Sequence, residues 1–415
     1  MSRVQEAPQR RLLIRDLAQV ATPAGVDAPL RGDALRRVDV LADAYVLCEG
    51  SRIAAVGRMR ELERLEPRRA GDVEELDGHG LVAIPGLVDC HTHACFAGDR
   101  VDEFALRVGG ASYEELHASG GGILSTVRAT RAAGEAALDA AVATHRAWML
   151  GHGTTTFESK SGYGLDRETE LASLRAIRRA GGIPTWLGAH AVPPEFSDAA
   201  SYVEFALEKV LPAARDLAEA ADVFVERGAF DAETARRYLT ACKQAGLELR
   251  IHGDQFTEAG AIPLAVELGA RSVDHLEATG AGGVRTLARS DVAAVLLPAS
   301  ALFLGRLQAP ARALVDAGAI VALATDFNPG SAFCESLPLV ASLAATQLGL
   351  ALEEILCALT VNAAHVLGRA DRIGRLAPGF DADVVLLDAP DWRYLAYHLG
   401  GQIVRHVVVK GERVA

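Results

Sequence analysis

Ionisable side chains recur at the ends of short apolar segments in the middle of the chain. An apolar run at 81–88 leads into the first two of these side chains. Histidine and aspartate are residue types that bind metal ions and transfer protons near neutral pH. If one fold gathers them, the sequence predicts a metal site. The residues are His91, His93, His190, His252, His275 and Asp326.

The spacing of His91 and His93 points both imidazoles in the same direction. In a strand, residues i and i+2 lie on one face, so Thr92 between them faces the other side. Neutral imidazoles suit Zn²⁺ or iron, with His252 as a third nitrogen ligand and Asp326 as an oxygen ligand. A His-x-His pair alone is weak evidence, because single histidines are often structural. The convergence of residues from several strands is what favours a metal.

The segments that end in these residues alternate with helical stretches rich in Ala, Leu, Glu and Arg. Parallel strands covered by helices are almost continuously apolar, and eight β/α units predict an α/β fold, a (β/α)8 TIM-type barrel. A doubly wound open sheet is the alternative, but no GxGxxG opens a helix after the first strand. Barrel enzymes carry their chemistry at the carboxyl ends of the strands, where the ionisable residues lie. The expected strands are 87–91, 154–159, 184–190, 222–226, 248–253, 272–276, 292–298 and 320–326.

Both ends of the chain differ from this middle part. Residues 1–83 and 366–415 contain short strand-like pieces broken by turns, such as "RRVDVLADAYVLCEG" and "QIVRHVVVKGERVA". Two β-rich flanks around a β/α middle predict one smaller β-sandwich domain formed by both chain termini. The barrel would then occupy residues 84–365.

Composition restricts the partners that the protein can have. The chain of 415 residues has a net charge of −12, which argues against nucleic acid as the main partner. The N-terminus lacks a signal-peptide pattern, and no apolar run is long enough to cross a membrane. Six cysteines without a CxxC pair predict reduced thiols. We therefore expect a cytoplasmic homodimer that acts on a small molecule and has neither nucleic-acid nor membrane partners.

These motifs resemble those of a known family. "PGLVDCHTH" on the first strand, histidines on the fifth and sixth, aspartate on the eighth and the split β-domain are similar to the amidohydrolase superfamily. Within it, "HTHACFAGDR", "GGGILSTVRATR", "ESKSGYGL", "LGAHAVPPEF", "SVDHLEAT" and "ATDFNPGS" resemble the imidazolonepropionase family. The resemblance implies hydrolytic ring opening of 4-imidazolone-5-propanoate to N-formimidoyl-L-glutamate, a step of L-histidine degradation.

The resemblance also implies how the metal is held and used. One divalent or trivalent ion, zinc or iron, would bind the residues named above as ligands and activate a water molecule, with Asp326 or His275 as the general base. Two-metal relatives carry a lysine at the end of strand four, where this chain has Glu226, so a single metal is expected. Lys160, after strand two, is interpreted as structural. The implied ligands are His91, His93, His252 and Asp326.

A second set of residues is implied to bind the substrate. Arg100 would pair with the propanoate carboxylate, although a surface ion pair is the usual role of a lone arginine. The chain departs from some family members at Gln255, where they carry glutamate, and a neutral amide cannot be the general base. The long loop 94–122 is either a lid or an ordered cap. The implied substrate contacts are Arg100, Tyr163, His190, Gln255, Asn328, Gly330 and Ser331.

Two other functions fit parts of this pattern. A nucleobase deaminase of the same superfamily shares the metal ligands but does not need an arginine for a carboxylate. A catalytically silent barrel that serves as a scaffold is a different class, and an intact ligand set speaks against it. Activity assays distinguish the first alternative, and metal analysis the second.

Overall fold

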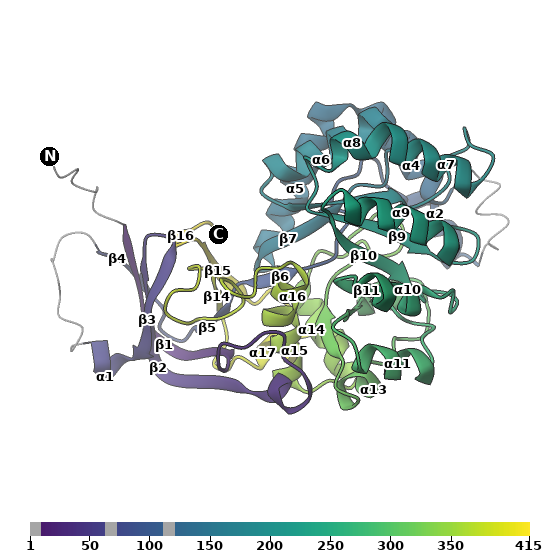
Figure 1. Cartoon of the computed structure of the whole chain (residues 1–415). Coiled ribbons are helices and arrows are strands. Elements are labelled where there is room, and N and C mark those ends of the chain that lie inside the picture. The colour runs from purple at the N-terminus through teal and green to yellow at the C-terminus, as the bar shows by residue number, and fades with distance from the viewer. Residues whose placement is uncertain (1–9, 63–72, 111–120) are drawn as a thin grey trace, which may run out of the picture.

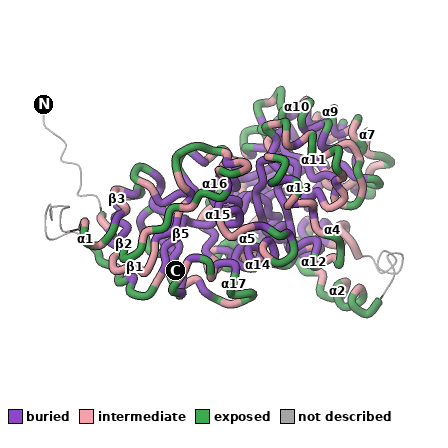
Figure 2. Tube along the Cα trace, turned by 90° about the horizontal axis from the view of Figure 1, so that it is seen from below, coloured by how far each residue is buried: buried purple, intermediate pink, exposed green. Residues whose placement is uncertain are grey.

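The structure, a computed structural model, describes residues 10–62, 73–110 and 121–415. Its strands form two sheets, one built from the middle of the chain and one from both ends (Figure 1). Buried residues concentrate inside the barrel and between it and its helices, whereas exposed residues lie on the outer helices and on the sheet formed by the chain ends (Figure 2).

The middle of the chain forms the expected barrel. Eight parallel strands follow one another in chain order, and each overlaps the segment predicted for it. Strands such as "AAVL" and "IVAL" are fully buried, as expected where helices cover the sheet. The strands are β6 (Leu87–Asp89), β7 (Thr154–Lys160), β8 (Ile183–Ala189), β9 (Ala220–Val225), β10 (Glu248–Gly253), β11 (Ser272–His275), β12 (Ala293–Leu296) and β13 (Ile320–Leu323).

The barrel closes just beyond the ends of its first and last strands. The N–H of Asp326 donates to the carbonyl of His91 (3.1 Å), and the N–H of His93 donates to the carbonyl of Phe327 (2.9 Å). Thr92 and Phe327 thus form a parallel bridge. The backbone of three of the four expected metal ligands is therefore part of the seam that closes the cylinder.

Helices surround the barrel on the outside (Figure 1). Local sequence explains where they begin: Asp166 accepts a hydrogen bond from the Thr169 N–H at the start of α6, and Asp231 does the same for α9. The helices are α1 (Met59–Leu62), α2 (Val101–Val108), α4 (Ile123–Ala133), α5 (Glu135–Gly151), α6 (Arg167–Arg179), α7 (Ala199–Phe205), α8 (Leu211–Ala214), α9 (Ala232–Gln244), α10 (Ala261–Leu268), α11 (Ala281–Ala288), α12 (Pro298–Phe303), α13 (Ala311–Asp316), α14 (Leu337–Thr346), α15 (Leu352–Leu359), α16 (Val361–Val366) and α17 (Tyr394–Tyr397).

The loop predicted as a lid or cap contains α2, and its residues 111–120 lie outside the described residues. None of the α2 side chains is buried.

The two chain ends form one connected sheet, as the β-rich flanks predict. The sheet curls, and β3 at its edge contacts the chain that follows the barrel. The N–H of Ile53 in β3 donates to the carbonyl of Phe380, and the carbonyl of Ile53 accepts the N–H of Gly379. One apolar core lies on the inner face of the sheet. The strands are β1 (Arg11–Pro23), β2 (Val38–Glu49), β3 (Arg52–Arg58), β4 (Val73–Asp77), β5 (Val82–Pro85), β14 (Val384–Leu387), β15 (Val404–Val409) and β16 (Glu412–Arg413).

A segment between β1 and β2 leaves this sheet and packs on the barrel. The fully buried Asn362 side chain accepts a hydrogen bond from the Leu30 N–H (2.8 Å) and donates to the carbonyls of Leu30 (3.0 Å) and Val321 in β13 (2.8 Å). One amide group therefore fastens the N-terminal segment to the last barrel strand.

Replacing this amide is expected to destabilise the protein. Asn362→Ala leaves buried backbone groups of Leu30 and Val321 unpaired, so we expect the free energy of unfolding to fall by about 3 kcal/mol. The measurement is the urea midpoint at constant metal concentration. Thr286→Ala, which removes a hydroxyl that bonds its own exposed helix at Gly282, is the control and should change stability by less than about 0.5 kcal/mol. An equal loss in both variants would contradict the role of Asn362.

Candidate metal centre and active site

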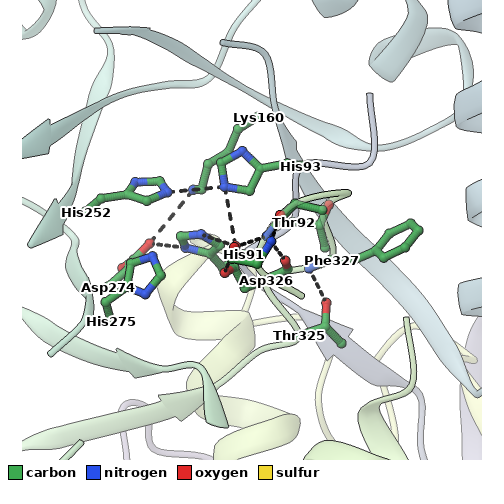
Figure 3. Close-up of polar contacts among 12 residues, drawn as sticks. His91, Thr92, His93, Lys160, His252, Asp274, His275, Thr325, Asp326 and Phe327 are labelled. Carbon is green, nitrogen blue, oxygen red and sulfur yellow. Dashed lines mark hydrogen bonds and ion pairs between the residues drawn. The ribbon is translucent and has the colours of Figure 1, made fainter. Parts of the chain in front are cut away.

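Four side chains meet at the carboxyl end of the barrel (Figure 3). His252 lies in β10, His91 and His93 follow the end of β6, and Asp326 follows the end of β13. Nε2 of His93 lies 3.2 Å from Nε2 of His252 and 3.5 Å from Oδ1 of Asp326. Nε2 of His91 lies 3.5 Å from the same oxygen. Ligands bound at 2.0–2.1 Å around a tetrahedral metal are about 3.3–3.4 Å apart, so these donors have the right spacing.

The tautomers of two of these histidines are fixed by carboxylates. Nδ1 of His91 lies 2.5 Å from Oδ2 of Asp274, and Nδ1 of His252 lies 3.1 Å from Oδ1 of Asp222. Because ionised carboxylates only accept hydrogen bonds, Nδ1 carries the hydrogen and Nε2 presents its lone pair to the cluster.

The cluster fits a cation between its donors. Nε2 of His91 is buried and has no hydrogen-bond partner among the described residues. Burial, reinforced by the Lys160 ammonium, holds the pKa of His91 well below its usual value, so the ring is neutral as a metal ligand requires. Neutral nitrogens and one carboxylate at this spacing form a group that is suited to hold a metal.

A buried ion network lies directly beneath the donors. Nζ of Lys160 is 2.9 Å from Glu158, 3.0 Å from Asp222 and 3.8 Å from Asp274, and all four side chains are inaccessible to solvent. Burial opposes its charge, but these carboxylates outweigh burial and raise the pKa of Lys160, which therefore stays an ammonium. Lys160 thus holds the two carboxylates that orient His91 and His252, in line with a structural role.

The sequence patterns do not point to Asp222 or Asp274. A signal for the network exists nevertheless: ionisable residues stand at i and i+2 in strands that are predicted to be buried, as in Glu158–Lys160 and Arg250–His252. Such pairs face the barrel interior together, where unpaired charges would be costly.

His275 lies beside the donors in a strained backbone conformation. Its ring centroid is 5.4 Å from that of His252, and its φ of 84° is unusual for a residue other than glycine. Asp326 also has a positive φ, of 56°. Burial lowers the pKa of His275, but the carboxylate of Glu277, 3.5 Å from Nδ1, together with those of Asp326 and Asp274, outweighs burial and raises it.

His190 and Tyr163 form the wall next to His93. The His190 ring stacks on His93 at 5.2 Å between centroids, and the Tyr163 ring lies 5.3 Å from His190. Nδ1 of His190 donates to the carbonyl of Gly162 (3.0 Å), which leaves Nε2 as an acceptor. Burial, followed by the effect of His252, lowers the pKa of His190 to about 3, so the ring is neutral.

Arg100 is largely buried and already has a partner. Its guanidinium forms a two-pronged contact with Glu103, and Glu103 also accepts a hydrogen bond from the Gly122 N–H (2.7 Å). A Cβ on Gly330 would lie 1.9 Å from Nη1 of Arg100, so the guanidinium covers Gly330. The pair is therefore not the surface ion pair that a lone arginine usually makes.

The loop after Asp326 is held together by Asn328. Its Oδ1 accepts hydrogen bonds from the N–H groups of Gly330 (2.8 Å) and Ser331 (2.7 Å), and its Nδ2 donates to the carbonyl of Asp326 and the hydroxyl of Ser331. These N–H groups, expected to be open to a ligand, are therefore occupied within the loop. The Ser331 hydroxyl also contacts Oδ2 of Asp326 (3.3 Å).

Gln255 is half-buried on the loop after β10. Glu226 fixes this loop, because its carboxylate accepts the N–H groups of Phe256 (2.8 Å) and Thr257 (3.1 Å). Glu226, at the end of the fourth barrel strand, thus holds the backbone next to Gln255.

Removing the charge behind His91 is expected to weaken metal binding. Asp274→Asn keeps the shape of the side chain but no longer fixes the tautomer of His91 by charge, so we expect the affinity for Zn²⁺ to fall about 10- to 100-fold. Competition with a chromophoric chelator measures it. Asp291→Asn, a fully exposed aspartate, is the matched control. Equal affinities of the two variants would rule out the proposed orientation by Asp274.

Comparison with known proteins agrees with the site. Residues 82–414 match the model of the Amidohydrolase family. A protein named imidazolonepropionase from Rubrobacter xylanophilus is 63% identical over 406 residues, which cover 96% of this chain and 97% of that protein. One of the same name from Chloroflexus aggregans is 46% identical over 422 residues, covering 97% and 98%.

Solved structures share the fold at low sequence identity. A triazine hydrolase variant has a TM-score of 0.72 at 19% identity and covers 98% of this chain and 94% of that chain. Guanine deaminase of E. coli has a TM-score of 0.71 at 13% identity, covering 98% and 99%. Separately, no helix in the described ranges is long and apolar enough to span a membrane. With its barrel, its histidine–aspartate cluster and relatives that match it almost end to end, the chain belongs to the amidohydrolase family and, within it, to the imidazolonepropionases.

Proposed function

We propose that the protein hydrolyses 4-imidazolone-5-propanoate to N-formimidoyl-L-glutamate, in L-histidine degradation, with one bound zinc or iron ion. The observation that carries this proposal is the meeting of His91, His93, His252 and Asp326 in a chain that is 63% identical to an imidazolonepropionase. A nucleobase deaminase is supported only by distant likeness of fold.

The reaction adds water to the ring carbonyl and breaks the bond between that carbon and the ring nitrogen. A metal ion at the cluster would supply Lewis acidity, polarising the carbonyl and lowering the pKa of a water molecule. Asp326 turns Oδ1 toward the histidines and Oδ2 toward Ser331, so Oδ2 can accept a proton from the attacking water. His275 lies on the other side of the donors and can give a proton to the leaving nitrogen.

The remaining residues orient the ring and its side chain. Nε2 of His190 can accept a hydrogen bond from a ring N–H, because its other nitrogen is bound to Gly162. Tyr163 packs beside it, and Gln255, a neutral amide, can hydrogen-bond the ring without acting as a base. Arg100 is the group proposed to bind the propanoate carboxylate, with Gly330 beneath it. Asn328 contributes by holding residues 330–331 in place.

The activity is tested by the loss of imidazolone absorbance when protein is added. We expect turnover by the wild type, its loss on treatment with a chelator, and its return with Zn²⁺ or Fe²⁺ added separately. Asp326→Ala should abolish turnover, because it removes both an oxygen ligand and the proposed base. Guanine and adenine are the control substrates. Turnover of a nucleobase but not of the imidazolone, or near-normal activity of Asp326→Ala, would refute the proposal.

Recognition of the carboxylate is tested separately. Arg100→Met should raise KM at least about tenfold with a smaller change in kcat, since it removes a charge-assisted contact. Gly330→Ala should have a similar effect, because its Cβ would displace the guanidinium. Arg236→Met, which removes a guanidinium paired with Glu267 on an outer helix, is the control.

An imidazolone without the propanoate group completes this test. The wild type and Arg100→Met should then have the same kcat/KM, because the carboxylate is absent. An unchanged KM of Arg100→Met for the full substrate would remove the proposed role. The expected homodimer, cytoplasmic location and lack of nucleic-acid and membrane partners stay predictions.

A further inference from the structure

We propose that Glu277 is a positioning residue for the reaction, whose carboxylate holds the His275 ring from the Nδ1 side and leaves Nε2 to face the substrate. The proposal rests on the proposed function, in which His275 gives a proton to the leaving nitrogen. Glu277 lies two residues beyond His275 in the loop after β11, inside the "SVDHLEAT" segment, but the family resemblance implies no role for it.

The side chains of Glu277 and His275 are in contact, and each has a polar atom that forms no hydrogen bond within the described ranges. Oε1 of Glu277 lies 3.5 Å from Nδ1 of His275, and the side chains are 6% and 2% exposed. Nδ1 of His275 and Oε2 of Glu277 are both buried without a hydrogen-bond partner among the described residues. Leaving such groups unpaired is costly, and a shift of about half an ångström would join Nδ1 of His275 to Oε1 of Glu277 in a hydrogen bond. Catalytic hydrogen bonds are often this long before the substrate binds.

The backbone between them is strained and held in place from outside. His275 and Leu276 have φ values of 84° and 73°, a conformation that L-residues rarely adopt. The backbone at the end of β10 holds this turn. The Leu276 N–H donates to the carbonyl of Gly253 (3.2 Å), and the Ala278 N–H donates to the backbone carbonyl of Asp254 (2.7 Å). The pair is thus placed by a rigid turn rather than by a free side chain.

The other carboxylates on the neighbouring loops are already engaged. Glu226 accepts N–H groups of the loop that carries Gln255, Asp254 accepts the Thr279 hydroxyl (3.0 Å), and Glu258 accepts the Gly280 N–H (2.7 Å). Of these loop carboxylates in the described part of the chain, Glu277 is the one that contacts a proposed catalytic histidine.

The chemistry assigned to Glu277 is that of a buried carboxylate behind a catalytic imidazole. It accepts the Nδ1–H hydrogen bond, which fixes the tautomer and the orientation of the ring. The proton that Asp326 takes from the attacking water passes to Nε2 of His275. When the carbon–nitrogen bond breaks, the electron pair goes to the nitrogen and Nε2 gives it this proton. Glu277 itself exchanges no proton and forms no bond with the substrate.

The test compares Glu277→Gln, Glu277→Asp and Glu277→Ala with the wild type, all with their metal content measured. We expect kcat of Glu277→Gln to fall roughly 100-fold, with KM and bound metal unchanged. Glu277→Asp should recover part of kcat, and added formate should raise kcat of Glu277→Ala, because a small carboxylate can fill the vacated space. Glu258→Gln, in the neighbouring loop and able to keep its contact with Gly280, should stay within twofold.

Several outcomes would overturn the proposal. An unchanged kcat of Glu277→Gln, a loss of activity that follows loss of metal, or a folded Glu277→Ala that formate does not activate would each do so. Loss of fold in both neutral variants would assign Glu277 a structural role instead. If the wild type does not convert 4-imidazolone-5-propanoate, the proposed function fails, whatever the Glu277 variants do.

Discussion

The seam between the first and last barrel strands is the constraint on which the rest of the site depends. The hydrogen bonds from Asp326 to His91 and from His93 to Phe327 close the cylinder and also set the spacing of three donor atoms. The same hydrogen bonds therefore close the sheet and position these donor atoms. The positive φ of Asp326 is the local cost of that arrangement, and the surrounding hydrogen bonds hold it.

Beneath the seam, the interior of the barrel contains charged side chains, whereas most of the buried core is apolar. Lys160 and Arg250 balance the carboxylates Glu158, Asp222 and Asp274, none of which reaches water. Buried ions of this kind rarely add stability, because their desolvation offsets their attraction. Their evident effect is to fix ring tautomers and to stiffen the platform under the histidines.

The sequence predicts the barrel and the donor atoms well, for a physical reason. Buried parallel strands are apolar runs, and their carboxyl ends share one rim, so His91, His252 and Asp326 could be placed together without coordinates. Contacts that depend on side-chain packing between distant segments could not be predicted. Two examples are the contact of Asp274 with Nδ1 of His91 and the hydrogen bonds that Asn328 forms within its own loop. The identity of the metal is likewise not encoded, because zinc and iron accept the same donors.

The contact of Arg100 with Glu103 has a consequence for selectivity. The guanidinium of Arg100 is already paired with the carboxylate of Glu103. An acid that binds at Arg100 must therefore displace Glu103 or use the N–H groups of the guanidinium that Glu103 leaves free. Glu103 thus competes with an incoming carboxylate for the Arg100 guanidinium, and it does so at a high effective concentration because it belongs to the same chain. If Arg100 binds the propanoate as proposed, weakly bound acids would not displace Glu103, whereas a substrate whose ring is also bound at the metal cluster would have the additional binding energy to do so.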